Sequence, residues 1–460
     1  MNVLLSVCLA ALVLVGLPAR ADAKWTRIAT EHFVFVGDAP ERQIRDIAQR
    51  LELFRDVLSR MFSSRATASP VPTVVVVFEN DRSYNPFKPR FQGRMVEVGG
   101  YFTAMPDTNY ITVNASAGAF AFETIFHEYT HFLLNNAVGH LPVWLNEGLA
   151  GFYETFEPRD GGKGAMIGIP SERQLRELQA TLTFLPLSEL LTVDHTSPLY
   201  NEGSRRGTFY AQSWALVHFL TLGSPQRAGL LQQYLTATSQ GEPSLEAFHT
   251  VFGNDLAAID EEVRLYVRKF RLNALRLQFT DQITAASIAR GTTVSDADVA
   301  GYLGDLLVGT NRLDEARVFL TDAIAAAPHA AGAITSLGLL EFRESRPEEA
   351  LALLERAVAL APDQPAASRV LGRLLLQRAA RGGLDEDDLY LRARSHLAHA
   401  RSLEPQHTTT MVMLAQAELA IDPDSDAGLQ LLREVVAAVP GRDDYQRMLA
   451  EALARRTVQP

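Results

Sequence analysis

The chain carries the segment HEYTH at residues 127–131 and, one short loop later, the segment WLNEG at residues 144–148. An α-helix brings side chains four residues apart onto one face, so His127 and His131 are spaced to reach a single zinc ion. Glu128 lies next to a ligand and is placed to act as general base on a metal-bound water. The first segment therefore predicts a helix that carries part of a zinc site.

A second helix supplies the third ligand. Mostly apolar residues on both sides of HEYTH predict a buried helix over about residues 118–136. Leu141-Pro142 then interrupts the chain, and residues 143–153 have the pattern of another helix. Two helices joined by a short loop pack antiparallel, which turns Glu147 toward the two histidines. Three protein ligands leave the open position of a catalytic zinc site, so we expect a zinc hydrolase.

Together the two segments resemble the gluzincin metallopeptidases, and within them the small bacterial group called peptidase MA-like. The resemblance covers roughly residues 25–280. It implies a thermolysin-like α+β peptidase domain that binds Zn²⁺ through His127, His131 and Glu147. It also implies Glu128 as the catalytic base.

The resemblance implies roles for residues outside the two segments. Glu154 stands where related peptidases place a carboxylate that supports a ligating histidine. Tyr210 stands where gluzincins commonly have a Tyr or His that hydrogen-bonds the oxyanion, and the alternative is a core or surface tyrosine. Residues 93–97 differ from the aminopeptidase motif G-x-M-E-N by one extra residue and lack its Asn. This difference favours an endopeptidase over an aminopeptidase.

The composition of this 460-residue chain sets broader limits. Its formal net charge of −11 disfavours nucleic acid or an anionic membrane as the main partner. Residues 1–23 have the pattern of a secretory signal peptide, and the alternative is an uncleaved anchor. Cys8 lies in this segment and is the sole cysteine, so the mature protein would have no disulfide. We expect a bacterial periplasmic or secreted protein without an integral membrane span after cleavage.

Residues 24–280 are expected to form the peptidase domain. Their patterns predict a mixed sheet followed by mostly helical structure. The expected strands lie at residues 31–36, 73–78, 99–102 and 109–113, and the expected helices outside the zinc site lie at residues 40–62 and 256–279. Residues 161–168 are expected as a surface loop. In a fold of this class, an edge strand beside the metal helix binds an extended peptide through backbone hydrogen bonds.

The C-terminal third repeats with a period of 34 residues. The pair Leu-Gly recurs at residues 303–304, 337–338 and 371–372, with alanines and prolines in the same phase. This is the tetratricopeptide pattern, in which small residues lie where paired helices touch. An insertion at Gly382–Asp388 lengthens the third unit, and a degenerate fourth unit and a capping helix follow. We expect an all-α solenoid over residues 296–460, after a linker over residues 281–295.

These observations predict a secreted zinc peptidase that acts on peptide or protein substrates. Solenoids present surfaces that bind peptides or proteins, so we expect a protein partner at the repeat array. Three roles of the array remain open: recruiting substrates, docking on an envelope complex, or covering the cleft. A non-catalytic zinc-binding scaffold for envelope complexes and a purely structural zinc ion are the alternatives. The presence of Glu128 beside the ligand set favours the enzyme.

Overall fold

The computed structural model describes residues 25–62, 69–91, 93–138, 141–181, 184–201, 205–227, 229–269, 271–279 and 288–458. The expected signal peptide, residues 1–23, lies outside these ranges. Within them, every helix is too short or too polar to cross a membrane.

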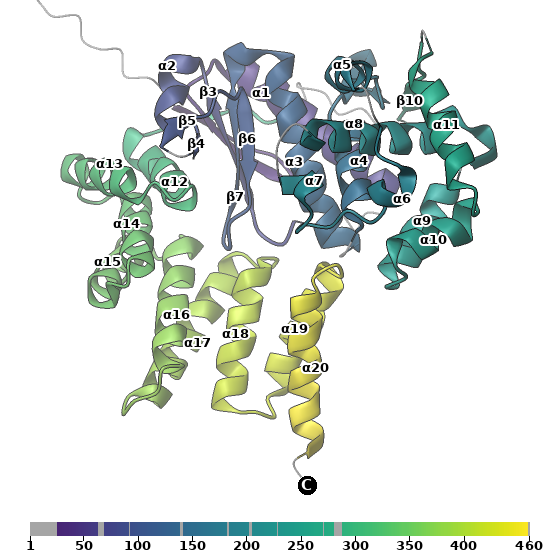
Figure 1. Ribbon diagram of the computed structural model, residues 1–460. Coiled ribbons are helices and arrows are strands. Elements are labelled where there is room, and N and C mark those ends of the chain that lie inside the picture. The colour runs from purple at the N-terminus through teal and green to yellow at the C-terminus, as the bar shows by residue number, and fades with distance from the viewer. Residues whose placement is uncertain are drawn as a thin grey trace, which may run out of the picture.

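A six-stranded mixed sheet forms the centre of the N-terminal domain, with the strand order β11-β1-β2-β3-β7-β6 (Figure 1). Its strands are β1 (Trp25–Ala29), β2 (Phe33–Gly37), β3 (Thr73–Phe78), β6 (Gly100–Thr103), β7 (Asn109–Asn114) and β11 (Thr292–Val294). Strands β2, β3 and β7 run parallel, and the others pair antiparallel with their neighbours. Every residue of β3 is buried, because helices cover both faces of the sheet.

One face of the sheet packs against α1 (Glu41–Phe62) and α3 (Ala119–Val138). Val75 and Val77 of β3 share this core with Leu51 of α1 and Tyr129 of α3. The sheet therefore fixes the position of α3, the helix that contains the HEYTH segment. The expected helices at residues 40–62 and 118–136 are confirmed to within two residues at each end.

The other face of the sheet packs against the first two helices of the C-terminal region, α12 (Asp296–Gly309) and α13 (Leu313–Ala326). Val74 and Val76 of β3 share this second core with Leu303 and Leu306 of α12. Side chains alternate between the two faces of a strand, so Val75 and Val77 face one core and Val74 and Val76 face the other. The first helices of the repeat array are therefore part of a hydrophobic core that they share with the central sheet.

The remaining elements of the N-terminal domain are short helices and two small sheets. The helices are α2 (Asp81–Tyr84), α4 (Val143–Tyr153), α5 (Glu172–Ala180), α6 (Leu187–Leu190), α7 (Pro198–Asn201), α8 (Arg205–His218), α9 (Leu230–Ser239), α10 (Ser244–Phe252) and α11 (Leu256–Val267). The strands are β4 (Arg90–Phe91), β5 (Arg94–Met95), β8 (Glu157–Arg159), β9 (Gly164–Ile167) and β10 (Leu275–Gln278). Helix α4 has the bounds that the sequence predicts.

Three sequence predictions are wrong for the same reason. In each case the segment contains a strand that pairs with a segment distant in the chain. The expected helix at residues 256–279 ends at Val267, and residues 275–278 instead form β10. The expected loop at residues 161–168 contains β9, which pairs with both β8 and β10. The expected linker at residues 281–295 contains β11, which extends the main sheet beside β1. Strand β1 itself was not expected.

The C-terminal region is an array of antiparallel helix pairs that resembles tetratricopeptide repeats. After α12 and α13 its helices are α14 (Ala331–Arg343), α15 (Pro347–Leu360), α16 (Pro365–Ala379), α17 (Glu386–Leu403), α18 (Thr408–Ile421), α19 (Asp426–Ala438) and the cap α20 (Asp443–Val458). The recurrent glycines allow close contact within pairs: a Cβ at Gly338 would lie 2.8 Å from Leu354 Cγ, and one at Gly372 2.6 Å from Leu397 Cγ. The insertion lengthens the α16–α17 loop and the first turn of α17.

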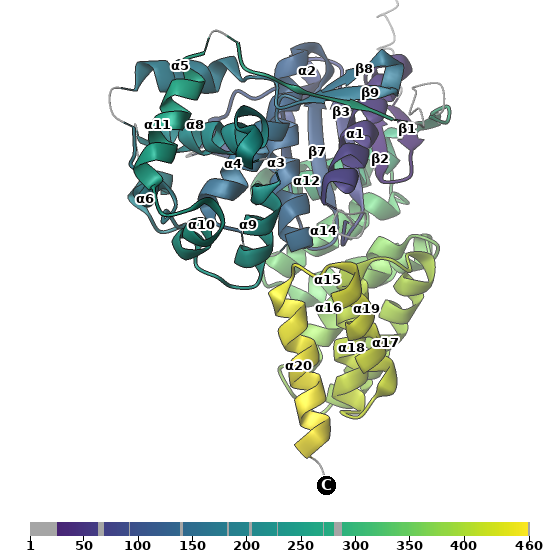
Figure 2. The same cartoon turned by 90° about the vertical axis from the view of Figure 1, so that its right-hand side faces the viewer.

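The array curves beneath the N-terminal domain, and the loop between β6 and β7 points into it (Figures 1 and 2). Asp107 in this loop forms ion pairs with Arg369 and Arg373 of α16, and its backbone oxygen lies 2.9 Å from His407 Nε2 at the start of α18. At the far end of the array, Gly441 N donates a 3.0 Å hydrogen bond to Asn136 O, near the end of α3. Part of the array surface that faces the N-terminal domain is therefore already in contact with residues of that domain.

Candidate metal centre

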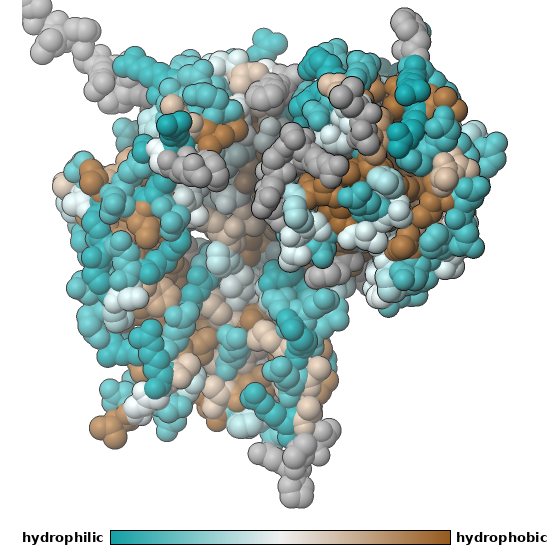
Figure 3. Space-filling view, viewed as in Figure 1, coloured by the Kyte–Doolittle hydropathy of each residue, from teal (hydrophilic) through white to brown (hydrophobic). Residues whose placement is uncertain are grey.

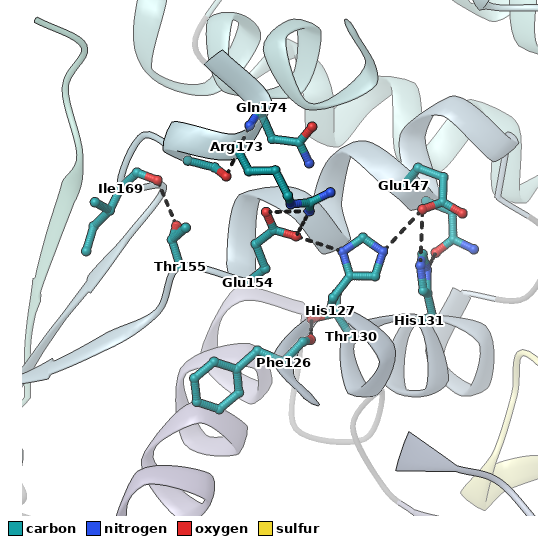
Figure 4. A network of polar contacts seen from close by, with 12 residues as sticks. Phe126, His127, Thr130, His131, Glu147, Glu154, Thr155, Ile169, Arg173 and Gln174 are labelled. Atoms are coloured by element: carbon teal, nitrogen blue, oxygen red, sulfur yellow. Dashed lines mark hydrogen bonds and ion pairs between the residues drawn. The ribbon is translucent and has the colours of Figure 1, made fainter. Parts of the chain in front are cut away.

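Helices α3 and α4 bring three potential metal ligands together (Figure 4). Glu147 Oε2 lies 3.3 Å from His127 Nε2 and 3.4 Å from His131 Nε2. One ligand atom from each of the three residues lies within 4.8 Å of the other two, and no other such group occurs among the residues that the structure describes. The expected set of His127, His131 and Glu147 is thus assembled by the fold.

Hydrogen bonds at the far nitrogen of each ring orient the two imidazoles. His127 Nδ1 lies 3.0 Å from Glu154 Oε2, and His131 Nδ1 lies 2.9 Å from Asn146 Oδ1. Both oxygens can only accept, so each Nδ1 carries a hydrogen, and Nε2 is the nitrogen that faces Glu147. An imidazole held in this way can bind a metal ion through Nε2 once that nitrogen is deprotonated.

Glu147 Oε2 is buried and has no hydrogen-bond partner. A buried carboxylate oxygen is costly unless positive charge lies beside it, and either a protonated histidine or a bound cation can supply that charge. Burial lowers the pKa of His127, but Glu147 and Glu154 outweigh burial and raise that pKa to about 9. Burial raises the pKa of Glu147, and the two histidines more than offset it, lowering that pKa to about 2. Both shifts have the same origin: the carboxylate and the imidazoles stabilise each other's charged forms.

The glycine that follows Glu147 lets α4 lie directly against α8. A Cβ at Gly148 would lie 2.5 Å from Ser213 O and 2.5 Å from Val217 Cγ2. Any larger residue at this position would push the two helices apart and move the carboxylate away from α3. The last residue of the WLNEG segment therefore helps to position the third ligand.

Glu154, at the C-terminal end of α4, lies where the resemblance implies a supporting carboxylate. Its side chain is almost fully buried, contacts His127 Nδ1, and accepts two 3.2 Å hydrogen bonds from Arg173 of α5. Arg173 was not expected from the sequence, because no local pattern links α5 to α3. It neutralises Glu154, which leaves Glu147 as the carboxylate available to a metal ion.

Tyr210 in α8 is connected to the ligand set through Tyr200, a residue that the sequence analysis did not single out. Its ring stacks on Tyr200 of α7, with centroids 6.2 Å apart, and the two phenols are hydrogen-bonded. Tyr200 also hydrogen-bonds with Glu147. Burial raises the pKa of Tyr200, and the Glu147 carboxylate raises it further, so its hydroxyl keeps its proton. His195 packs edge-on against Tyr200, 5.2 Å between centroids.

Glu128 and the sheet edge complete the surroundings. Glu128 is exposed and lies one turn before His131 on α3. Strand β6 is the last strand of the described sheet and packs closely on α3, because a Cβ at Gly100 would lie 2.8 Å from Ile125 Cδ1. Figure 3 shows hydrophobic residues gathered on the viewed face around α4, α8 and α11. The site therefore combines a polar ligand set with an apolar surface nearby.

Residues 121–244 match the protein family described as "Protein of unknown function (DUF1570)". The matched range contains the three candidate ligands as well as Glu154, Tyr200 and Tyr210. No curated protein matches the chain.

Solved structures of repeat proteins resemble about a third of the chain. The MamA RS-1 ArsTM double mutant is 17% identical, with a TM-score of 0.30, over 35% of this chain and 86% of its own. A thermophilic TPR protein of Thermus thermophilus, TTC0263, is 18% identical, with a TM-score of 0.30, over 35% and 82%. YrrB, a TPR protein with an unusual peptide-binding site, is 20% identical, with a TM-score of 0.20, over 35% and 93%.

Proposed function

We propose that this protein is a zinc-dependent peptidase of the gluzincin type, exported to the bacterial periplasm or beyond. The observation that carries the proposal is Glu147 Oε2, which is buried, lacks a hydrogen-bond partner and faces two imidazole Nε2 atoms. His127, His131 and Glu147 would hold Zn²⁺, and a bound zinc ion would supply Lewis-acid chemistry and lower the pKa of a bound water to about 7.

The chain's own residues have distinct tasks in this proposal. Glu128, exposed beside the ligands, accepts the proton of the attacking water and passes it to the leaving amine. Tyr210 and Tyr200 are the phenolic donors beside the ligand set, and one of them hydrogen-bonds the oxygen of the tetrahedral intermediate. Glu154 and Arg173 keep the His127 ring in its orientation.

The substrate in this proposal is an extended peptide on the outer edge of β6, the last strand of the described sheet. Main-chain groups of an edge strand can pair with a further strand, which gives affinity without sequence preference. Because β6 packs on α3, a peptide held there lies above the helix that carries both histidines. An endopeptidase fits this geometry, since no feature of an edge strand requires a chain terminus.

Zinc content and cleavage of casein peptides, measured for the full-length mature protein and for Glu128→Gln, test the proposal. About one zinc per chain in both proteins, with cleavage by the wild type alone, is the expected result. Absence of zinc in both would refute the ligand assignment. Zinc in both without cleavage of any peptide would refute the peptidase and leave the non-catalytic scaffold.

A further inference from the structure

A cavity with a volume of about 570 Å³ lies next to the candidate metal centre. Its walls come from α1, α3, the end of α4, β8 and the start of α5. Two of its lining residues connect it to the centre: Glu154 contacts His127, and Glu123 lies one helical turn before His127 on α3. Arg159, Glu172 and Arg176 line the cavity and are exposed, so the cavity opens to solvent.

Most charged groups in this cavity are already paired with one another. The ion pairs join Arg173 to Glu154, Arg159 to Glu157 and Arg176 to Glu172. The polar groups Thr155 and Ser171 are also satisfied, by Ile169 O and by the backbone N–H of Gln174. The polar contacts of these groups are therefore made with other residues of the protein.

Arg50 is different. Its guanidinium carbon lies over the Phe122 ring, 4.3 Å from the centroid, and the guanidinium forms no ion pair or hydrogen bond within the described part of the chain. Burial lowers the pKa of Arg50, and Glu157 and Asp46 act on it only at longer range. A half-buried guanidinium without a carboxylate partner keeps its hydrogen-bond donors free, and a planar carboxylate matches these donors in bidentate fashion.

The carboxylates Glu123 and Glu154 line the cavity close to His127 in the fold. Burial raises the pKa of Glu123, and Glu154 raises it further, while Arg173 opposes them. Arg50 is the cationic lining residue that has no ion pair with a described residue, whereas Arg159, Arg173 and Arg176 each have one.

We infer that this cavity is a specificity subsite that receives a carboxylate of the peptide substrate, with Arg50 as its anchor. The inference rests on the proposed peptidase function, which it extends to substrates with an acidic group. The carboxylate comes either from an Asp or Glu side chain or from the C-terminus of the peptide. In both cases the chemistry is a charge-assisted, bidentate hydrogen bond in a partly desolvated site.

The test measures binding of labelled peptides to zinc-loaded, full-length Glu128→Gln, which does not turn them over under the proposed function. One probe set consists of N-acetylated, C-amidated hexapeptides of alanine in which a single position carries Glu or Gln. A second pair is the all-alanine hexapeptide with a free or an amidated C-terminus. We expect one acidic probe to bind about tenfold tighter than its neutral counterpart, the size of a charged hydrogen bond. The probe set that shows the preference identifies the source of the carboxylate.

Two variants in the Glu128→Gln background assign the preference to Arg50. Arg50→Met should remove it, so that acidic and neutral probes bind equally. Arg60→Met is the matched control, because Arg60 lies on the same helix and over the Phe279 ring but is paired with Asp56 outside the cavity. A preference that survives Arg50→Met, or that Arg60→Met removes equally, overturns the inference.

Failure of this inference is distinguishable from failure of the peptidase proposal. If the wild type cleaves peptides without an Arg50-dependent preference for acidic ones, the subsite is refuted and the peptidase stands. If no peptide is cleaved but acidic probes bind in an Arg50-dependent way, the subsite stands and the catalytic proposal is refuted.

Discussion

The Tyr110 hydroxyl in β7 donates a 2.8 Å hydrogen bond to Asp305 Oδ2 in α12. This bond joins the central sheet to the first repeat helix, in the same layer where Val74 and Val76 pack on Leu303. Strand β11 adds a backbone link, because it extends the sheet immediately before α12 begins. Helices α12 and α13 of the array thus pack on the face of the sheet opposite to the face that supports α3.

Replacing Leu306 by Ala should destabilise the whole molecule in one step. Leu306 is fully buried in the core shared by α12 and the sheet, so its truncation should cost about 3 kcal/mol. We expect a single thermal transition at a lower midpoint, followed both by circular dichroism and by zinc release. Two separate transitions, with zinc retained through the first, would show that array and sheet unfold independently. For the same reason, deletion of residues 296–460 should yield protein that does not fold.

Asp305→Asn should stabilise the protein at neutral pH and have less effect in acid. Burial raises the pKa of Asp305 to about 6, with Asp107 adding to the rise and Tyr110, Arg369 and Arg373 opposing it. The folded state therefore binds more protons than the unfolded state between about pH 4 and pH 6, and wild-type stability falls as the pH rises through this range. Asparagine does not titrate.

Thermal melts of both proteins at pH 4.5 and pH 7.5 measure this effect. The midpoint difference, variant minus wild type, should increase by a few °C on going to pH 7.5. His407 has the opposite sign, since burial and Arg369 lower its pKa to about 4, but it is present in both proteins and cancels. A pH-independent difference would contradict the prediction.

Glu154→Gln should weaken zinc binding by about 10- to 100-fold, the usual effect of losing a carboxylate that orients a ligating histidine. The glutamine side chain has the same shape as glutamate but carries no charge. It therefore cannot accept charge-assisted hydrogen bonds from Arg173 and His127 as the carboxylate does. Competition with a fluorescent zinc chelator measures the affinity. Glu262→Gln, which disrupts an ion pair with Arg227 on the distant α11, is the control and should bind zinc as the wild type does.

Removing the hydroxyl of Tyr200 or Tyr210 should separate catalysis from metal binding. At the residue that contacts the oxyanion, replacement by Phe should lower kcat by about 100- to 1,000-fold, with one zinc retained. The other variant should change kcat less, because its phenol acts through its neighbour. Tyr390→Phe in α17 serves as a control for loss of a phenol elsewhere. Full activity in both variants would refute an oxyanion role for the pair.

Local sequence was sufficient to predict that His127, His131 and Glu147 lie together, since four-residue spacing on one helix and the packing of the next helix across a short loop are local properties. The bounds of α4 and the Gly-Leu contacts of the repeats follow from local sequence in the same way. Strands β9, β10 and β11 were not predicted correctly, because each is short and depends on a partner far away in the chain. Their sequences carry no alternation long enough to indicate a strand.

The amino-acid sequence by itself determined which atoms can meet a metal ion: two histidines on one helical face and a glutamate on the next helix. Tertiary structure alone decided their surroundings, namely Tyr200 on Glu147, Arg173 on Glu154 and the repeat helices on the far face of the sheet. The reason is physical. Spacing along a helix is fixed by backbone geometry, whereas contacts between distant segments are chosen by burial and charge pairing over the whole chain.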